Sequence, residues 1–445
     1  MSSQVFFGRL IHSKSLEEIE IHKQAALGID TNGIIAFLDP DVKNAEEACK
    51  KHSGFADAKC TTLEPLQFLF PGLIDSHLHA PQWPNLAIGM EGNLREWVET
   101  YTDPIEASYK DTDKARRVYD EMVQKELEMG STTVAYNSSI QVEATNVLAD
   151  TCLKYGQRAV IGKLCILTGS THDNWDESPE QSLEDAQKCI DHIRKIDPEE
   201  SLIMPCVKPR GGPYAPPKVM AGLGAISHEQ KTRVQAHMCE TTEDITRTLK
   251  LHTGFEHYTD MYKSYDMLHE GSILAHCIHL SDHDIEMLRD TKAGVAHNAN
   301  SNTCLRDGEC RVRQLLKAGV KVGLGTDCSA GYSTFMLDSI RQASNVSRHL
   351  AMHNDDDEWM LSFPELVYLA TLGSASVLTI NDKVGNFEVG KCFDALIVDT
   401  GLRDCINIAG WEDDDLALLK KWVFMGDDRS IQKVFVNGKL VTSKV

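Results

Sequence analysis

Eight short apolar runs recur between residues 69 and 325 of this chain, and polar or amphipathic stretches separate them. The runs span residues 69–75, 132–136, 159–166, 202–207, 233–237, 272–276, 294–297 and 320–325. Residues 114–128 and 183–195 show apolar spacing typical of surface helices. Strands that alternate with helices pair in parallel. The rhythm therefore predicts an α/β fold with a (β/α)8 TIM-type barrel.

Both ends of the chain show short apolar runs separated by turns. Residues 25–29 and 34–38 flank Asp30-Thr31-Asn32-Gly33, and an Asn437-Gly438 turn divides two runs near the C-terminus. Each pattern is typical of a β-hairpin. With 445 residues the chain is long enough for a barrel and a smaller unit. We predict a small β-sandwich domain from residues 1–68 plus 385–445, and a barrel domain from 69–384.

Charge and composition narrow the partners of the protein. The formal net charge is −21 at pH 7, whereas nucleic-acid binding needs basic patches. The sequence has no run of 18 apolar residues, so we expect no membrane-spanning helix. The first residues lack the charged and apolar regions of a secretory signal. The 13 cysteines contain no Cys-x-x-Cys pair, which favours buried, reduced thiols. We expect a cytoplasmic protein that binds neither nucleic acid nor membrane.

Five of the eight predicted strands end at a histidine or an aspartate, namely at His77 and His79, His237, His276, His297 and Asp327. The carboxyl ends of barrel strands meet at one mouth. His77 and His79 lie two residues apart, so on a strand both point to the same side. Each histidine alone is more typical of an ordinary core or surface residue. Together they predict a hydrolytic metal site with three imidazoles and one carboxylate.

Glu240 lies three residues after His237, just beyond the end of a predicted strand. A carboxylate beside a metal-activated water is the expected proton carrier. The alternative is an acidic residue that only stabilises a helix N-terminus. Cys239, Cys277 and Cys328 adjoin candidate ligands, but neighbouring strand residues face opposite sides. We expect these thiols to pack in the core.

The strand-end motifs resemble those of the amidohydrolase superfamily. The resemblance rests on Pro71-Gly72-Leu73-Ile74-Asp75-Ser76-His77-Leu78-His79-Ala80, His237-Met238-Cys239-Glu240, His276 and Gly325-Thr326-Asp327. Within the superfamily the chain is similar to the guanine deaminases, through Ala80-Pro81-Gln82, residues 94–102, Pro209-Arg210 and residues 322–333. Residues 308–313 resemble the fungal branch, and residues 385–391 and 426–429 extend the similarity towards the C-terminus.

This resemblance implies zinc-dependent hydrolysis of guanine to xanthine and ammonia, in purine catabolism or salvage. It implies a homodimer with one zinc ion per subunit, held by His77, His79, His237 and Asp327. Asp327 would also take a proton from the attacking water, and His276 would orient that water. Glu240 would protonate a ring nitrogen of the base.

The implied substrate-binding residues are His79, Gln82, Arg210, Gly211, His237, Glu240 and Asp327. Gln82 and Arg210 resemble the residues that read the edge of the purine. An arginine suits a carbonyl oxygen because its planar fork donates two hydrogen bonds.

Two segments depart from the pattern of the guanine deaminases. Where the family has a phenylalanine after Pro209-Arg210, this chain continues Gly211-Gly212-Pro213-Tyr214-Ala215-Pro216-Pro217. Ring contacts of that kind are worth about 0.5–1.5 kcal/mol beyond area burial. We expect the two glycines to loosen the loop, and Tyr214 could fold back to replace the ring. The second departure follows the seventh predicted strand, where the family has a His-Cys-Pro-x-Ser-Asn pattern and this chain reads His297-Asn298-Ala299-Asn300-Ser301-Asn302.

These departures leave alternatives open at this stage. The barrel could act on another aminopurine, a pterin or a triazine. A non-catalytic scaffold on the same fold is a second alternative, although every expected ligand and Glu240 are present. A phosphate-binding barrel lacks support, because Gly325-Thr326-Asp327 belongs to the metal motif. Three imidazoles and a carboxylate would also accept iron or manganese.

Overall fold

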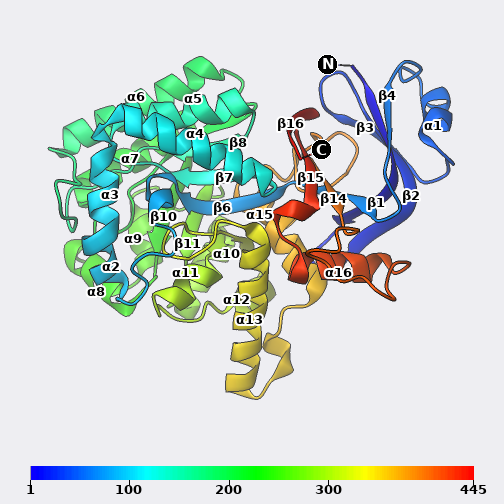
Figure 1. Ribbon diagram of the computed structural model, residues 1–445. Coiled ribbons are helices and arrows are strands. Elements are labelled where there is room, and N and C mark those ends of the chain that lie inside the picture. Colours follow the sequence, from blue (N-terminus) through cyan, green and yellow to red (C-terminus); the bar gives the residue numbers. More distant parts are fainter. Residues whose placement is uncertain (1, 445) are drawn as a thin grey trace.

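The computed structural model describes residues 2–444 and shows a parallel eight-stranded barrel beside a mixed sheet (Figure 1). The barrel strands are β6 (Leu73–His79), β7 (Ser131–Asn137), β8 (Arg158–Gly162), β9 (Ile203–Val207), β10 (Arg233–Met238), β11 (Ser272–His276), β12 (Gly294–His297) and β13 (Lys321–Leu324). Each strand pairs in parallel with the next. The residues after β13 close the ring, since the Asp327 N–H donates to the His77 carbonyl at 2.8 Å. The predicted barrel is confirmed.

Helices that follow the strands cover the outside of the barrel (Figure 1). They are α4 (Thr112–Glu128), α5 (Val142–Tyr155), α6 (Pro179–Ile196), α7 (Pro217–Gln230), α8 (Thr242–Leu251), α9 (Tyr258–Ser264), α10 (Asp282–Thr291), α11 (Ala299–Cys304), α12 (Val312–Ala318) and α13 (Met336–Asn354). Helix α4 begins after Asp111, whose carboxylate accepts from two N–H groups of the first turn. It buries Ala115, Tyr119, Met122 and Leu127, a spacing that lines one helix face.

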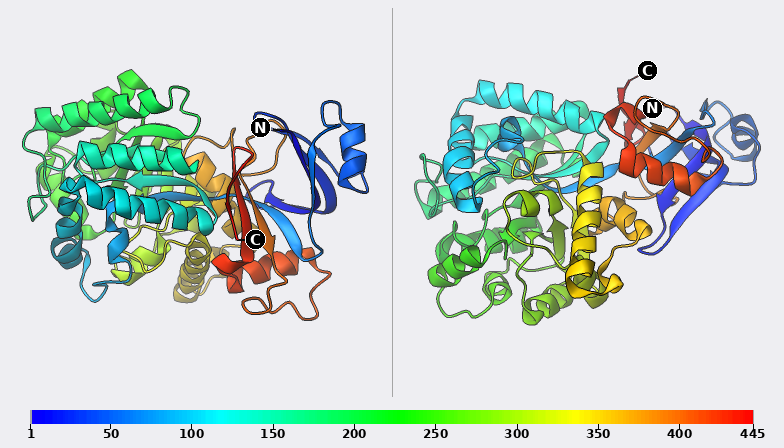
Figure 2. Two further views of the ribbon diagram at one scale, coloured as in Figure 1. Left: turned by 45° about the horizontal axis from the view of Figure 1, so that its top comes forward. Right: turned by 60° about the horizontal axis from the view of Figure 1, so that its bottom comes forward.

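The two ends of the chain meet in one mixed sheet beside the barrel (Figure 2). Its strands are β1 (Gln4–Ser13), β2 (Ile19–Ile29), β3 (Ile35–Asp39), β4 (Lys59–Thr62), β5 (Gln67–Pro71), β14 (Ala395–Asp399), β15 (Ile431–Val436) and β16 (Lys439–Ser443). Helices α1 (Ala45–Lys51) and α16 (Asp415–Met425) accompany them. Both predicted hairpins are confirmed, as β2–β3 and β15–β16. The rings of Phe6, Phe393 and Phe435 pack together in this sheet's own core.

The single strand predicted at residues 69–75 is wrong, because the structure divides it between the two sheets. β5 ends at Pro71 and pairs with β1 and β14, whereas β6 begins at Leu73 and pairs with β7. Gly72 lies between them, and a Cβ atom there would lie 2.0 Å from the Thr132 hydroxyl oxygen. Both strands are buried on both faces, so the apolar run shows no break. The domain boundaries assigned from the sequence stay a prediction.

The interior of the barrel is filled by side chains and does not form an open channel. Apolar side chains from six strands pack there with α15 (Ser374–Val377) and the residues after it, including Ile74, Ala135, Val160, Met204, Ile273, Ala296, Val377 and Ile380. This packing leaves the carboxyl ends of the strands as the mouth of the barrel.

A helical stretch that ends in α15, Asp357–Val377, is long and apolar enough to cross a membrane, with a mean hydropathy of 1.2. Its members are η4 (Asp357–Trp359), α14 (Phe363–Tyr368), η5 (Leu369–Gly373) and α15. However, 61% of its apolar window is buried against the rest of the protein, as in a core helix.

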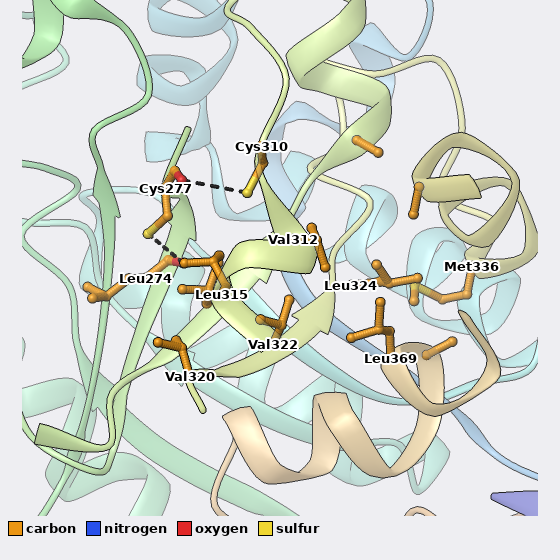
Figure 3. Packing of buried hydrophobic residues seen from close by; sticks show 14 of the residues in the cluster. Leu274, Cys277, Cys310, Val312, Leu315, Val320, Val322, Leu324, Met336 and Leu369 are labelled. Carbon is orange, nitrogen blue, oxygen red and sulfur yellow. Dashed lines mark hydrogen bonds between the residues drawn. The ribbon is translucent and has the colours of Figure 1, made fainter. Parts of the chain in front are cut away.

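The cysteines next to the candidate ligands pack in the apolar core, as predicted. Figure 3 shows Cys277 and Cys310 among Leu274, Val312 and Leu315. The Cys277 thiol donates to the Leu274 carbonyl at 3.7 Å, and the Cys310 thiol donates to the Cys277 carbonyl at 3.6 Å. All 13 cysteines are free thiols.

Between β6 and α4 the chain runs past the mouth of the barrel. This segment contains η1 (Ala80–Asn85), α2 (Leu94–Trp97), η2 (Val98–Thr102), α3 (Asp103–Ala107) and η3 (Ser108–Lys110). Trp97 and Val98 pack against Leu305 and Ala330, which follow β12 and β13. The segment therefore forms one wall of the space above the strand ends.

Candidate active site

Five side chains converge at the mouth of the barrel. His77 and His79 come from β6, His237 from β10, His276 from β11, and Asp327 from the turn after β13. Asp327 Oδ1 lies 3.2 Å from His77 Nε2 and 3.6 Å from His79 Nε2, and Oδ2 lies 3.7 Å from His276 Nε2. Ligand atoms of His77, His237, His276 and Asp327 all lie within 4.8 Å of one another. The sequence-based set has His79 in place of His276, and both lie at this centre.

The free nitrogens of these imidazoles fit a metal ion. Nε2 of His77 and Nε2 of His276 are buried and make no hydrogen bond. His237 Nδ1 donates to the Arg210 carbonyl at 2.5 Å, which leaves its Nε2 only 3.0 Å from His79 Nε2. Several buried lone pairs that face one point are costly unless a cation shares them. Imidazole and carboxylate donors suit a borderline divalent ion such as zinc.

The protonation states also favour a cation. Burial lowers the pKa of His79 and of His237 well below the usual value, so both imidazoles are neutral and can donate lone pairs. Burial alone would raise the pKa of Asp327, but His276 and His77 hold it well below its usual range. The centre thus offers neutral nitrogens and one negative charge.

The backbone at the strand ends is held in uncommon conformations. Arg210, His276 and Asp327 have φ angles of 51°, 71° and 53°, in the left-handed region. Such angles in residues other than glycine persist only where the surroundings enforce them, often at functional sites. Buried Asp75 supplies part of that enforcement, because it accepts from the His77 N–H at 3.0 Å and the Thr326 N–H at 3.1 Å.

Glu240 and His276 form an acid–base pair beside the centre. Glu240 Oε1 lies 3.4 Å from His276 Nε2. Burial, followed by the charges of Asp327 and Asp244, raises the pKa of Glu240 well above its usual value. A carboxyl group with a raised pKa is suited to donate a proton. His276 Nδ1 donates to the Asn302 side-chain oxygen at 2.9 Å, which directs its Nε2 lone pair to the centre.

The segment that contains the second departure also supplies the partner of His276, through Asn302, a position at which the chain keeps the asparagine of the family pattern. Asn302 belongs to α11, in the segment that follows His297. His297 itself is buried at the end of β12 and lies outside the group of converging ligand atoms. Burial lowers its pKa to about 4, so it is a neutral core histidine.

A cavity of about 560 Å³ opens above this centre. It is lined by four of the converging residues and by further predicted site residues, namely His79, His237, His276, Asp327, Gln82, Arg210 and Glu240. This volume is typical of sites for small organic ligands. Gly211 is not among the lining residues and pairs with His237 through a parallel bridge.

Glu106 organises the part of the cavity wall beside the metal centre, with its Oε1 3.8 Å from His79 Nδ1, and the sequence did not reveal it. It is fully buried in α3. Its carboxylate accepts from Arg210 Nη1 at 2.5 Å, Gln82 Nε2 at 2.8 Å and Asn174 Nδ2 at 2.9 Å. Burial would lower the pKa of Arg210, but the charge of Glu106 raises it, so Arg210 stays a cation. The Gln82 oxygen accepts from the Ser329 N–H at 3.2 Å, which fixes its amide.

The loop after Arg210 is firmly held, and the expectation that its glycines loosen it is wrong. The Gly212 N–H donates to the Tyr258 hydroxyl at 2.8 Å, and the Gly212 carbonyl accepts from His252 Nε2 at 3.1 Å. A Cβ atom on Gly212 would lie 2.4 Å from the Thr248 methyl group, so glycine permits this close approach. Tyr214 lines the cavity, with the Arg210 guanidinium 5.1 Å from its ring centre.

The fold and the metal-ligand geometry define a barrel hydrolase, and the comparisons identify its class. The profile of the Amidohydrolase family matches residues 68–441, and the chain belongs to that family. Within it, the relatives place the chain among the guanine deaminases. A probable guanine deaminase of Schizosaccharomyces pombe is 41% identical over 98% of this chain and 83% of its own length. The guanine deaminase of Homo sapiens is 32% identical over 99% of this chain and 96% of its own.

A solved structure agrees with this placement. The crystal structure of a guanine deaminase from C. acetobutylicum, with guanine bound in its active site, superposes with a TM-score of 0.89. The two sequences are 28% identical, and the match covers 99% of this chain and 100% of the other.

Proposed function

We propose that this protein hydrolyses guanine to xanthine and ammonia, with one zinc ion held by His77, His79, His237 and Asp327. One observation carries the proposal: the metal ligands, the acid Glu240 and the Gln82–Arg210 wall line a single cavity. The relatives of similar length, named guanine deaminases, support it. The non-catalytic scaffold is disfavoured because the ligand set and the acid are both in place.

Each protein group has a defined task in this reaction. A zinc ion held by His77, His79, His237 and Asp327 would supply Lewis acidity that lowers the pKa of the attacking water towards neutrality. Asp327, held as a carboxylate, accepts a proton from the attacking water, and His276 accepts a hydrogen bond that orients it. Glu240 donates its proton to a ring nitrogen, which draws electrons from the carbon that carries the amino group. A C–O bond forms at this carbon, the C–N bond breaks, and ammonia leaves with the transferred protons.

The wall formed by Gln82, Arg210 and Tyr214 selects the base. Arg210 presents N–H donors that suit the carbonyl oxygen of guanine, and Gln82 presents an amide whose orientation Glu106 and Ser329 fix. The family pattern has a phenylalanine directly after the arginine, where this chain has Gly211. Here Tyr214, further along the same loop, supplies an aromatic ring at the cavity wall. A stacked ring of this kind favours a planar heterocycle over a flexible substrate.

A substrate panel tests the assignment. The zinc-loaded protein is assayed for xanthine from guanine, and in parallel for products from adenine, 8-oxoguanine, pterins and triazines. We expect the highest kcat/KM with guanine. A much faster reaction with another base would overturn the guanine assignment while leaving the metal chemistry intact. Elemental analysis after dialysis against a weak chelator should find one tightly held zinc per chain, and iron or manganese would correct the metal.

We also propose that the protein is a cytoplasmic homodimer in purine catabolism or salvage. The free thiols support a reduced compartment. Sedimentation equilibrium of the zinc-loaded protein tests the oligomeric state, and a monomer at micromolar concentration would contradict it. Imaging of the tagged protein in cells tests the compartment.

A further inference from the structure

Three potential metal ligands gather on the terminal sheet, in the first hairpin of the chain. His12 lies on β1, and Glu20 and His22 lie on β2. In the antiparallel register His12 faces Glu20 directly, and His22 lies two residues further along β2. Directly opposed residues and residues two apart share one face of a sheet. One ligand atom from each of the three lies within 4.8 Å of the others.

The polar atoms of the cluster are incompletely satisfied. His22 Nε2 lies 2.8 Å from Glu20 Oε1, whereas His12 Nε2 lies 3.9 Å from Glu20 Oε2. His12 is 3% exposed, and its Nε2 is buried without a hydrogen-bond partner. Its Nδ1 lies 3.3 Å from the Ser13 carbonyl and donates to it, so Nε2 carries a lone pair that faces the carboxylate. A buried lone pair beside a carboxylate gains nothing unless a cation or a proton lies between them.

The surroundings favour a cation over a second proton. Burial lowers the pKa of His12, whereas the charges of Glu20 and Glu388 favour a positive charge beside this imidazole. Glu388 is largely exposed and pairs with Lys391 at 2.9 Å. His22 and Glu20 are partly exposed, so an ion can reach the cluster from solvent.

We propose that His12, Glu20 and His22 form a second, non-catalytic site for a divalent transition metal ion, zinc above all. Two imidazoles and one carboxylate, with a position left for water, are a known zinc donor set. Nickel and copper bind such donors as well. The site lies on the hairpin of β1 and β2, apart from the barrel mouth (Figure 1).

An ion at this site would join two neighbouring strands near the seam with the barrel. Ser13, next to His12, contacts Thr371 of η5, with 3.4 Å between the two hydroxyl oxygens. An ion that binds only the folded state stabilises it in proportion to the logarithm of its concentration. We therefore expect zinc to raise the melting temperature even when the catalytic zinc is already bound.

The test uses the full-length protein with its catalytic zinc in place. Zinc and cobalt(II) are titrated into wild type, His22→Gln and Glu20→Gln, and bound metal is counted after gel filtration. We expect wild type to take up one further equivalent of metal. The absorption spectrum of the cobalt-loaded protein should show no thiolate-to-cobalt charge-transfer band. Loss of an outer-shell partner typically weakens metal binding roughly 10–100-fold. Each variant loses a direct ligand, so its affinity for the second ion should fall by more than this. The kcat/KM with guanine should stay unchanged in all of them.

His192→Gln is the matched control. His192 Nε2 lies 2.8 Å from an Asp150 oxygen and its side chain is 25% exposed, close to the 18% exposure of His22. This control should keep the second equivalent and the zinc-dependent rise in melting temperature. Equal uptake by wild type and His22→Gln, or no second equivalent in wild type, would show that Glu20 and His22 form an ordinary surface hydrogen bond.

Discussion

The metal centre and the neighbouring wall that Glu106 holds together are built in different ways. His77, His79, His237 and His276 lie on barrel strands, and Asp327 follows one directly. Gln82, Arg210 and Tyr214 lie on connecting segments, and a shared contact with Glu106 positions the first two. Backbone pairing of the barrel fixes the first group, whereas one buried carboxylate positions Gln82 and Arg210 in the second.

This difference predicts how each side responds to substitution. Removal of a metal ligand leaves the strands in place and abolishes the chemistry. Removal of Glu106 should leave the chemistry in place and disturb the two residues that we propose contact the base. Catalysis and substrate recognition should therefore be separable in this protein, and the predictions below start from the largest effect.

Loss of a metal ligand should have the largest effect. In His237→Ala the bound zinc should be lost, and kcat/KM should fall on the order of 10⁴-fold or more, because the metal supplies the activated water. Elemental analysis and steady-state assays measure the two effects together. A variant that retains full zinc and turnover would remove His237 from the metal site. His297→Asn, at a strand end outside the ligand group, is the control and should keep both.

Loss of the acid should affect turnover alone. Glu240→Gln should keep its zinc and lose roughly 10²–10⁴-fold in kcat, the usual contribution of a positioned proton donor. The amide has nearly the same shape, so KM should change little. Steady-state assays measure kcat and KM, and metal analysis measures the zinc content. Near-normal turnover in this variant would assign the proton transfer to another group.

Loss of Glu106 should affect recognition and stability. In Glu106→Gln the buried Arg210 guanidinium loses its charged partner, which costs roughly 3–5 kcal/mol of stability for a broken buried ion pair. A lost hydrogen bond to a charged group costs about 1.5–3 kcal/mol, so KM for guanine should rise roughly 10–150-fold while zinc content stays constant. Urea unfolding and substrate titration measure the two changes.

The exposed pair Arg95–Glu99 supplies the control for this variant. Its atoms lie 2.9 Å apart, but the two side chains are 61% and 44% exposed. Glu99→Gln should therefore change stability by about 1 kcal/mol or less. If Glu106→Gln behaves like Glu99→Gln, the buried carboxylate does not organise the wall.

The same difference explains what the sequence could predict. His77, His237, His276 and Asp327 were found because strand ends in a barrel meet at one place, and the apolar runs mark those ends. Glu106 carries no such mark. It lies in a short helix within a long connection, 24 residues from Gln82 and 104 from Arg210. No periodicity relates positions that meet only through tertiary folding.

Two further errors have physical causes of the same kind. The run at residues 69–75 crosses from one sheet to the other at Gly72, and strands buried on both faces give one continuous apolar signal. The glycines after Arg210 predicted a flexible loop because glycine has wide conformational freedom in an unfolded chain. In the folded protein Gly212 lies against Thr248 and Tyr258, where its missing side chain allows tight packing instead.

The smallest expected effect tests this reversal. Gly212→Ala should destabilise the protein by roughly 1–3 kcal/mol, since its Cβ atom would overlap the Thr248 side chain and the Tyr258 hydroxyl. Gly211→Ala is the matched control for stability, because its Cβ atom would lie 3.5 Å from the nearest atom, an ordinary contact. Urea unfolding of both variants measures the difference. Equal stability of the two would mean that the loop has room to move.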